Sequence, residues 1–296
     1  MIDLGPHAPR DSSLPPDPGP SPDEWSVMEL DLDAYLARVG LAGADLPPTA
    51  ATLAAVHRAH LGAIRFENLD IMLGRAVRVD LPSIAAKLVA GRRGGYCYEQ
   101  GQLFGAALER LGFGVDRRLA RVWRPGPVPP RTHLTLRVTV PDGGQAWLAD
   151  VGFGSSPPGP VSLDEPGPQE IDGWTYDVVP GDRPGTWDLR ELEDGEWVRQ
   201  YQFDGAIVVP VDVVLSNHYT STYPGSWFTH TPIVVRRDPD AITSLLGRTR
   251  TVTRPGHVKE RRELPDGEWL AALEDVFGLP FTPPEQARLL ATAGGV

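Results

Sequence analysis

The chain has 296 residues, which is enough for two or three structural units and a full hydrophobic core. Charged residues make up 23% and hydrophobic residues 41%, as in an ordinary globular protein that lives in water. The net charge of -11 argues against a nucleic-acid binder, which needs a basic face to neutralise phosphates.

A single cysteine, Cys97, excludes an internal disulfide and zinc sites built from several thiolates. No H-E-x-x-H pattern occurs, so we predict no metal site. The sequence also shows no signal peptide at its start and no apolar run long enough to span a membrane. We therefore expect a cytoplasmic protein, in a compartment where a free thiol stays reduced.

Residues 1–24 differ in character from the rest of the chain. The stretch from Met1 to Pro22 holds seven prolines, and almost nothing apolar follows Leu14. This composition predicts a disordered, proline-rich tail. A partner-docking role in polyproline geometry is the alternative to an extension without a role, and the sequence favours the latter.

Residues 25–112 carry the pattern of a helical unit. Apolar residues at helical spacing predict four helices, at 30–36, 47–63, 81–90 and 98–111. Asp80 is placed as the N-cap of the third helix, with Pro82 in its first turn. Gly112 is placed to end the fourth helix.

From Phe113 the period changes to short alternating runs, which are typical of strands. The predicted strands cover 115–123, 133–140, 145–151, 174–179, 187–192 and 197–203. Clusters such as Pro141-Asp142-Gly143-Gly144 separate them and indicate hairpin turns. After about residue 208 helical and strand patterns mix: helices are expected at 210–218 and 268–277, strands at 233–237 and 248–254. The fold class predicted from this order is α+β.

Cys97 is the first candidate for chemistry because of its position. Gly94 and Gly95 precede it and a predicted helix follows, so its thiol lies beside the free N–H groups of a helix start. That position is expected to lower the thiol pKa and favour the nucleophilic thiolate. The glycines allow a sharp turn and the close approach of another backbone. On position alone, a buried structural cysteine is an equally good interpretation.

A nucleophilic cysteine needs a base, and the base needs a group that orients it. Among seven histidines, His133 stands out because it opens a predicted strand, and Asp150 ends the next strand after a hairpin turn. Residues near the open ends of such a hairpin face each other, which predicts a Cys–His–Asp triad. His57 and His60 are expected to be ordinary surface or half-buried residues of an early helix.

Rival chemistries lack their motifs. The chain has no G-x-S-x-G nucleophile elbow and no G-x-x-x-x-G-K-[ST] phosphate loop. Gly152-Phe153-Gly154 lacks the third glycine of a dinucleotide-binding fingerprint.

Four segments in order resemble the arylamine N-acetyltransferase family, over about residues 26–285. They are Phe66-Glu67-Asn68-Leu69-Asp70; Arg93-Gly94-Gly95-Tyr96-Cys97-Tyr98-Glu99-Gln100; Thr132-His133 with Asp150-Val151-Gly152-Phe153-Gly154; and Asn217-His218-Tyr219-Thr220-Ser221-Thr222 with Ser226-Trp227-Phe228. The resemblance implies a three-part fold on a core like that of cysteine proteases and transglutaminases. A helical bundle (25–112) would carry Cys97, a β-barrel (113–208) would carry His133 and Asp150, and an α/β lid (209–296) would follow.

The resemblance also implies a ping-pong reaction. Acetyl-CoA would acylate Cys97, CoA would leave, and a small aromatic amine or hydrazine would take the acetyl group. The family's other site residues map onto this chain as an acceptor pocket of Phe66, Phe153 and Phe228, a donor site at Thr132 and Trp123, and a structural salt bridge between Arg93 and Glu67. Core packing is the alternative role for the aromatic residues, most of all for Phe66.

Three features depart from the family's pattern. Gly101 stands where the family usually has Asn, and Arg65 stands where it commonly has Pro. The loop from Arg124 to Arg131 is rich in proline and adjoins the implied donor site. These departures bear on the acyl donor and the acceptor more than on the triad.

Three other functions remain open on the sequence. An amide synthase that acts on a polyketide-type acyl thioester would use the same mechanism. A cysteine hydrolase or transglutaminase would share the triad and differ in what resolves the acyl-enzyme. A non-catalytic binding protein is disfavoured by the intact set of Cys97, His133 and Asp150. The sequence predicts neither the acceptor nor the oligomeric state.

Overall fold

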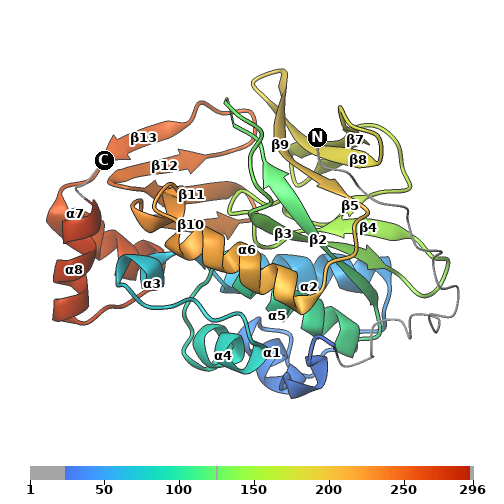
Figure 1. Cartoon of the computed structure of the whole chain (residues 1–296), viewed down its shortest axis with the longest axis horizontal. Coiled ribbons are helices and arrows are strands. Elements are labelled where there is room, and N and C mark those ends of the chain that lie inside the picture. Colours follow the sequence, from blue (N-terminus) through green and yellow to red (C-terminus); the bar gives the residue numbers. More distant parts are fainter. Residues whose placement is uncertain (1–23, 125, 294–296) are drawn as a thin grey trace, which may run out of the picture.

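The computed structural model describes residues 24–124 and 126–293, so the predicted tail, apart from Glu24, lies outside the described residues. These residues form a mixed α and β fold in which helices pack around two antiparallel sheets (Figure 1). Among the helices of this part of the chain, none is both long and apolar enough to cross a membrane.

The N-terminal third is helical, as predicted. Its helices are η1 (Val27–Glu29), α1 (Leu32–Arg38), α2 (Ala50–Ala63), α3 (Leu69–Met72), α4 (Leu81–Ile84), η2 (Ala85–Ala90) and α5 (Cys97–Arg110). The side chain of Asp80 accepts a hydrogen bond of 3.0 Å from the N–H of Ser83, which confirms the predicted N-cap. The helix predicted at 81–90 begins as α4 and continues as the wider π-type turn η2.

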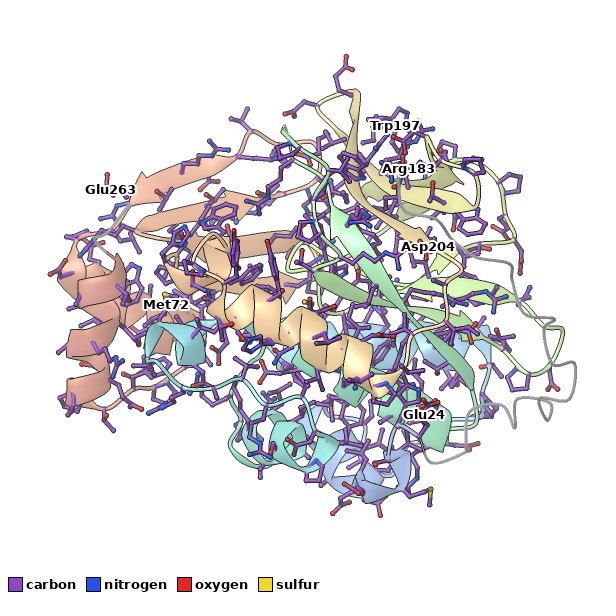
Figure 2. The ribbon with its side chains drawn as sticks, in the orientation of Figure 1. Glu24, Met72, Arg183, Trp197, Asp204 and Glu263 are labelled. Carbon is purple, nitrogen blue, oxygen red and sulfur yellow. The ribbon has the colours of Figure 1, made fainter. Side chains whose placement is uncertain are left out.

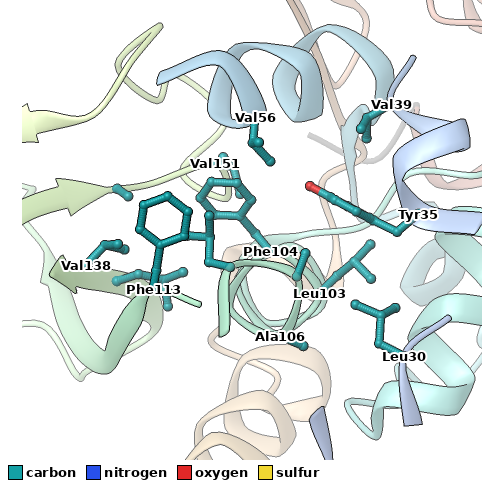
Figure 3. Packing of buried hydrophobic residues seen from close by; sticks show 14 of the residues in the cluster. Leu30, Tyr35, Val39, Val56, Leu103, Phe104, Ala106, Phe113, Val138 and Val151 are labelled. Atoms are coloured by element: carbon teal, nitrogen blue, oxygen red, sulfur yellow. The ribbon is translucent and has the colours of Figure 1, made fainter. Parts of the chain in front are cut away.

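Helix α5 is the centre of the first core. Leu103 and Phe104 are fully buried, and Figure 3 shows them pointing from α5 toward Val56 and Tyr35. On another side α5 contacts residues of the eight-stranded sheet, among them Val138. Burying a large apolar side chain stabilises a fold by roughly 1.5–3 kcal/mol, so these contacts hold α5 firmly in place. The position of Cys97, its first residue, follows from this packing.

The middle of the chain forms an eight-stranded sheet in the order β5-β4-β3-β2-β9-β8-β7-β6. Its strands are β2 (Gly114–Val122), β3 (His133–Thr139), β4 (Ala146–Ala149), β5 (Val161–Ser162), β6 (Gln169–Ile171), β7 (Trp174–Pro180), β8 (Thr186–Glu193) and β9 (Glu196–Asp204). Edge strand β5 packs against β7, so the sheet curls into a nearly closed barrel. All six predicted strands are present, and the short β5 and β6 were not predicted.

The last third contributes four strands to a five-stranded sheet in the order β1-β10-β11-β12-β13. The strands are β1 (Phe66–Glu67), β10 (Ile233–Asp238), β11 (Ala241–Leu246), β12 (Thr249–Thr253) and β13 (Glu260–Glu263); the helices are α6 (Pro210–Thr222), η3 (Trp227–Thr229), α7 (Asp266–Ala271), η4 (Ala272–Val276) and α8 (Pro283–Ala293). Because β1 pairs with β10, Phe66 lies opposite Val235 although the two are far apart in sequence.

Helices α7 and α8 cover one end of this sheet (Figure 1). Met72 of α3 lies beside them in Figure 2 and shares a buried cluster with Trp269 and Leu289. The segment that carries Phe66 is thus anchored on both sides, by β-pairing and by this cluster.

Candidate active site

The backbone before Cys97 is held against the segment that ends at β1. The N–H of Gly95 donates to the carbonyl of Arg65 (3.1 Å), and the N–H of Glu67 donates to the carbonyl of Gly95 (3.0 Å). A Cβ at Gly94 would lie 2.3 Å from the carbonyl oxygen of Arg65, a distance that no real side chain tolerates. The predicted need for glycine at a close backbone approach is therefore confirmed here.

A second close approach joins Cys97 to the Asp150 segment. A Cβ at Gly152 would lie 2.8 Å from the Cα of Cys97 and 3.0 Å from its carbonyl oxygen. The backbone of Gly152 thus touches the backbone of Cys97 directly. The distance between the helix start and the barrel is set by main-chain contact.

His133 and Asp150 meet as predicted. Strands β3 and β4 pair from Leu136 and Ala149 onward, and the two residues lie just beyond, where the strands part. The Nε2 of His133 and the Oδ2 of Asp150 are 2.6 Å apart, and both side chains are buried. The other carboxylate oxygen of Asp150 accepts the N–H of Gly152 at 2.9 Å. This arrangement leaves Nδ1 of the imidazole for a different partner.

Asp150 is held as a carboxylate. Burial by itself would raise its pKa, but the charge and hydrogen bond of His133 outweigh burial and lower the pKa below its ordinary value. The hydroxyl of Tyr201 and the N–H of Gly152 act in the same direction. A buried carboxylate in this state can fix the imidazole tautomer and stabilise an imidazolium.

The pKa of Cys97 moves opposite to the prediction. Burial raises the pKa of the thiol well above its ordinary value, and the backbone hydrogen bonds at Leu134 and Tyr98 lower it without offsetting burial. The prediction from the helix start was therefore wrong in direction, because the loss of hydration, to which the charges of Asp150 and Glu99 add, outweighs these backbone hydrogen bonds. A thiolate can form here only if a nearby base takes the proton.

The prediction for His57 and His60 was also wrong, because both are fully buried. The Nδ1 atom of His60 is hydrogen-bonded to the hydroxyl of Tyr35, at 3.0 Å. Burial lowers the pKa of His57 to about 4, so it is neutral at physiological pH. Helical spacing alone did not reveal that this face of α2 is turned inward.

Cys97 and His133 line one cavity of about 970 Å³, which lies between the barrel and the second sheet. The predicted pocket residues Phe66, Phe153 and Phe228 line the same cavity, as does Thr132. The ring centroids of His133 and Phe153 are 5.2 Å apart, and those of Phe66 and Phe228 are 6.3 Å apart. The thiol, the imidazole and an aromatic wall therefore share one space.

Trp123 is not among the residues that line the cavity. Its neighbours Val122 and Arg124 do line it, and side chains alternate along an extended strand, so Trp123 faces the other way. Its ring lies under the guanidinium of Arg199, at 4.8 Å. The position of its side chain does not support the predicted contact with the donor.

Comparisons with known proteins identify the family of the chain. The sequence profile of the N-acetyltransferase family matches residues 49–285. The arylamine N-acetyltransferase of Escherichia coli is 36% identical over 273 residues, which cover 88% of this chain and 95% of that protein. The chain belongs to the arylamine N-acetyltransferase family. It is an enzyme of this type.

Solved structures of arylamine N-acetyltransferases have the same fold. The Nocardia farcinica enzyme superposes with a TM-score of 0.85 at 40% identity and covers 93% of this chain and 98% of its own. The Mycobacterium marinum enzyme in complex with CoA superposes with a TM-score of 0.82 at 34% identity, covering 88% and 99%.

Two of the three departures from the family's pattern lie outside the cavity lining. Gly101 packs against Leu134, whose Cδ2 would be 2.9 Å from an added Cβ, so this change concerns the packing of α5 on β3. Arg65 donates to the carbonyl of Gly62 at 2.6 Å, on the protein's exterior.

The proline-rich loop is the departure that reaches the site. Pro129 and Pro130 line the cavity, and the guanidinium of Arg124 lies 3.8 Å from the ring centroid of Trp227, which lines it too. This contact joins the loop to η3 and borders the space in which substrates must fit.

Several site residues were not predicted. The ring of Tyr201 lies 4.9 Å from that of His133, and its hydroxyl is 3.2 Å from the Oγ1 of Thr135. Trp174 and Glu191 line the cavity from β7 and β8. These residues belong to strands without a local motif. Alternation shows that such side chains share a face, but only the curled barrel shows which face meets the cavity.

The predicted salt bridge between Arg93 and Glu67 is present at 2.7 Å. This salt bridge belongs to a larger group that also contains Asp70, Lys87 and Glu99. The Nζ of Lys87 lies 2.8 Å from a carboxylate oxygen of Asp70 and 2.8 Å from one of Glu99. Burial raises the pKa of Glu99 to about 7. Within residues 24–124 and 126–293, His, Cys, Asp and Glu side chains form no cluster suited to a metal ion.

Proposed function

We propose that the enzyme moves an acetyl group from acetyl-CoA to the nitrogen of an arylamine or hydrazine through a thioester on Cys97. One observation carries this proposal: His133 and Cys97 line the same cavity, and the Nε2 of His133 lies 2.6 Å from the Oδ2 of Asp150. The relative from M. marinum binds CoA, which supports a CoA thioester as the donor.

In the first half-reaction, Nε2 of His133 stays hydrogen-bonded to Asp150. The other ring nitrogen, Nδ1, therefore takes the proton of the Cys97 thiol. Burial raises the pKa of that thiol, so the proton transfer is needed for the sulfur to attack the thioester carbonyl. The new bond joins sulfur to the acetyl carbon, and the bond between that carbon and the CoA sulfur breaks. CoA leaves as a thiol after taking the proton from the imidazolium.

In the second half-reaction, the amine nitrogen attacks the acetyl carbon and loses a proton to His133. The bond between the acetyl carbon and the sulfur breaks, and Cys97 regains its proton from the imidazolium. We assign Phe66, Phe153 and Phe228 to the acceptor, because aromatic walls hold an aryl ring and limit water. We assign Thr132 to the donor side, since its carbonyl oxygen lies 3.7 Å from the sulfur of Cys97.

The proposal includes a three-part layout with a core like that of cysteine proteases and transglutaminases. Residues 25–112 would supply the nucleophile, 113–208 the base and its carboxylate, and 209–296 the lid. The order of the elements supports this division, since helices precede α5, the barrel strands follow it, and α6 begins after β9. A thiol that must remain reduced fits the cytoplasm, which is the compartment we propose.

Intact-mass measurement after mixing the protein with acetyl-CoA tests the thioester. We expect one added acetyl group, which disappears when an arylamine is supplied and is absent in Cys97→Ala. A protein that acetylates the amine without ever carrying the group on Cys97 would contradict the ping-pong mechanism.

The cavity of about 970 Å³ is much larger than an acetyl group requires, which keeps an amide synthase as a second candidate. Longer acyl thioesters distinguish the two functions. If they acylate Cys97 and acetyl-CoA does not, the enzyme is an amide synthase. If the acyl-enzyme decays equally fast with and without an amine, water resolves it and the enzyme is a hydrolase.

A further inference from the structure

The cavity wall carries an acidic side chain that the proposed reaction does not use. Glu191 of β8 lines the cavity yet is only 4% exposed. Among the described residues, none donates a hydrogen bond to its carboxylate or lies within salt-bridge distance of it. Buried carboxylates are nearly always paired, so this one has an unmet capacity for a donor.

The surroundings of Glu191 show the same lack of partners. Arg237 of β10 is 5% exposed, and its Nε, Nη1 and Nη2 atoms form no hydrogen bond with the described residues. Its guanidinium lies 4.4 Å from the ring centroid of Trp174. The indole nitrogen of Trp174 and the hydroxyl of Tyr176 are also buried, with no hydrogen-bonding partner in the part of the chain that the structure describes.

Glu193, two residues further along β8, provides a contrast. It also lines the cavity, but its carboxylate is occupied by an ion pair with Lys259 and by a hydrogen bond of 3.3 Å from Gln200. Of these two acidic side chains, only Glu191 is free to bind a ligand group.

We propose that Glu191 forms a subsite that binds a cationic, N–H-bearing substituent on the acceptor, such as an amidinium group. The inference rests on the proposed function and names a class of acceptor for it. A carboxylate only accepts hydrogen bonds, and a planar cation with two N–H groups matches its two oxygens. Arg237 lies next to Trp174 and is not part of the cavity lining, so it does not occupy the place of the ligand.

The charges around Glu191 fit this role. Burial raises its pKa to about 7, the negative charge of Glu193 adds to that rise, and Arg237 and Lys259 oppose it. Tyr176 faces Glu191 from β7 and is neutral. Glu191 is therefore poised to ionise near neutral pH, and a bound cation would favour the ionised form.

Two matched arylamines test the subsite: 4-aminobenzamidine, which carries an amidinium, and the neutral 4-aminobenzamide. We expect the ratio of their kcat/KM values to favour the amidinium compound by about 10- to 100-fold in the native enzyme. The neutral amide leaves the buried carboxylate of Glu191 without a cationic partner, which costs binding free energy. In Glu191→Gln this ratio should fall to about one. A ratio of two substrates does not depend on how much of the variant is folded.

Glu193→Gln is the matched control, and it should keep the native ratio because Glu193 is already paired. The ratio should also rise between pH 6 and 8 in the native enzyme, as Glu191 ionises, and stay flat in Glu191→Gln. Division of one substrate by the other removes the pH dependence of the triad, which both substrates share.

Equal ratios in the native enzyme and in Glu191→Gln would overturn the subsite. Failure of the proposed function looks different, because then neither compound is acetylated. In that case benzamidine and benzamide, which lack the arylamine, are titrated calorimetrically into both proteins. Selective binding of benzamidine that Glu191→Gln loses would support the subsite, and equal binding would refute it.

Discussion

Two groups of largely buried charges differ in how they are satisfied. The paired cluster reaches the first turn of α5 through Glu99 and consists of Glu67, Asp70, Lys87, Arg93 and Glu99. In the unpaired cluster, formed by Glu191 and Arg237, neither charged group has a hydrogen-bonding partner among the described residues. Both groups are buried, so burial alone does not distinguish them.

The difference teaches how to interpret a buried charge. In the paired cluster the charges fix the backbone around Cys97, since Glu99 also accepts the N–H of Tyr96 at 3.1 Å. In the unpaired cluster the charges cost free energy without fixing anything in the free protein. The first pattern is typical of positioning, and the second is typical of a site that awaits a ligand.

The largest effect is expected at a third buried pair, His133 and Asp150, where pairing acts on the reaction itself. Asp150→Asn should lower kcat by about 10³- to 10⁴-fold, because the amide no longer holds the imidazole or stabilises its cation. Steady-state acetylation of an arylamine measures the loss. Asp116→Asn, on an exposed carboxylate, is the control, and full activity of Asp150→Asn would remove Asp150 from the triad.

The next largest effect is expected in the paired cluster. Lys87→Met leaves Asp70 and Glu99 without their shared cation and should lower the free energy of unfolding by about 3–5 kcal/mol. Urea unfolding followed by circular dichroism measures this change. In contrast, Arg237→Met removes a buried charge that has no hydrogen-bonding partner among the described residues, so it should not lower the free energy of unfolding. Equal losses in the two variants would break the comparison.

Glu191 should make stability depend on pH. Its pKa is about 7 in the folded protein and ordinary in the unfolded chain, so the native fold loses stability as pH rises from about 4.5 to 7. Glu191→Gln lacks this loss and should exceed the native protein by about 3 kcal/mol above pH 7, with the gap closing near pH 4.5. Urea unfolding at several pH values measures the gap. A gap that does not vary with pH would contradict the raised pKa.

The smallest effect on stability is expected at an ion pair that is not buried. Arg58 and Asp172 form two hydrogen bonds of 3.0 and 3.1 Å, but their side chains are 50% and 33% exposed. Arg58→Met should therefore change the free energy of unfolding by less than about 1 kcal/mol. The same urea assay applies, and a loss as large as that of Lys87→Met would show that pairing matters more than burial.

Much of the fold was predictable, because its elements carry local signals. The helix starting at Asp80 and the hairpin before Asp150 follow from capping and turn residues, which act over a few positions. The meeting of His133 and Asp150 followed from the hairpin alone. Strand β1 was not predictable, since only its pairing with β10 makes Phe66-Glu67 a strand.

The electrostatic predictions fared worse than the geometric ones. The first turn of α5 was correctly placed, but the pKa of Cys97 depends on how deeply other segments bury it. Glu191 has no motif, and its role depends on β7, on β8 and on β10, which is distant from them in sequence. Burial and the absence of partners are properties of the assembled fold, and no window of the chain contains them.

The contact between Gly152 and the backbone of Cys97 has an evolutionary consequence. The spacing between Cys97 and the segment that carries Asp150 is set by main-chain contact, which side-chain substitutions hardly disturb. The cavity wall at β7 and β8 includes the side chains of Trp174 and Glu191, which can change without altering that contact. Acceptor preference can therefore diversify among relatives while the acyl-transfer step stays in register.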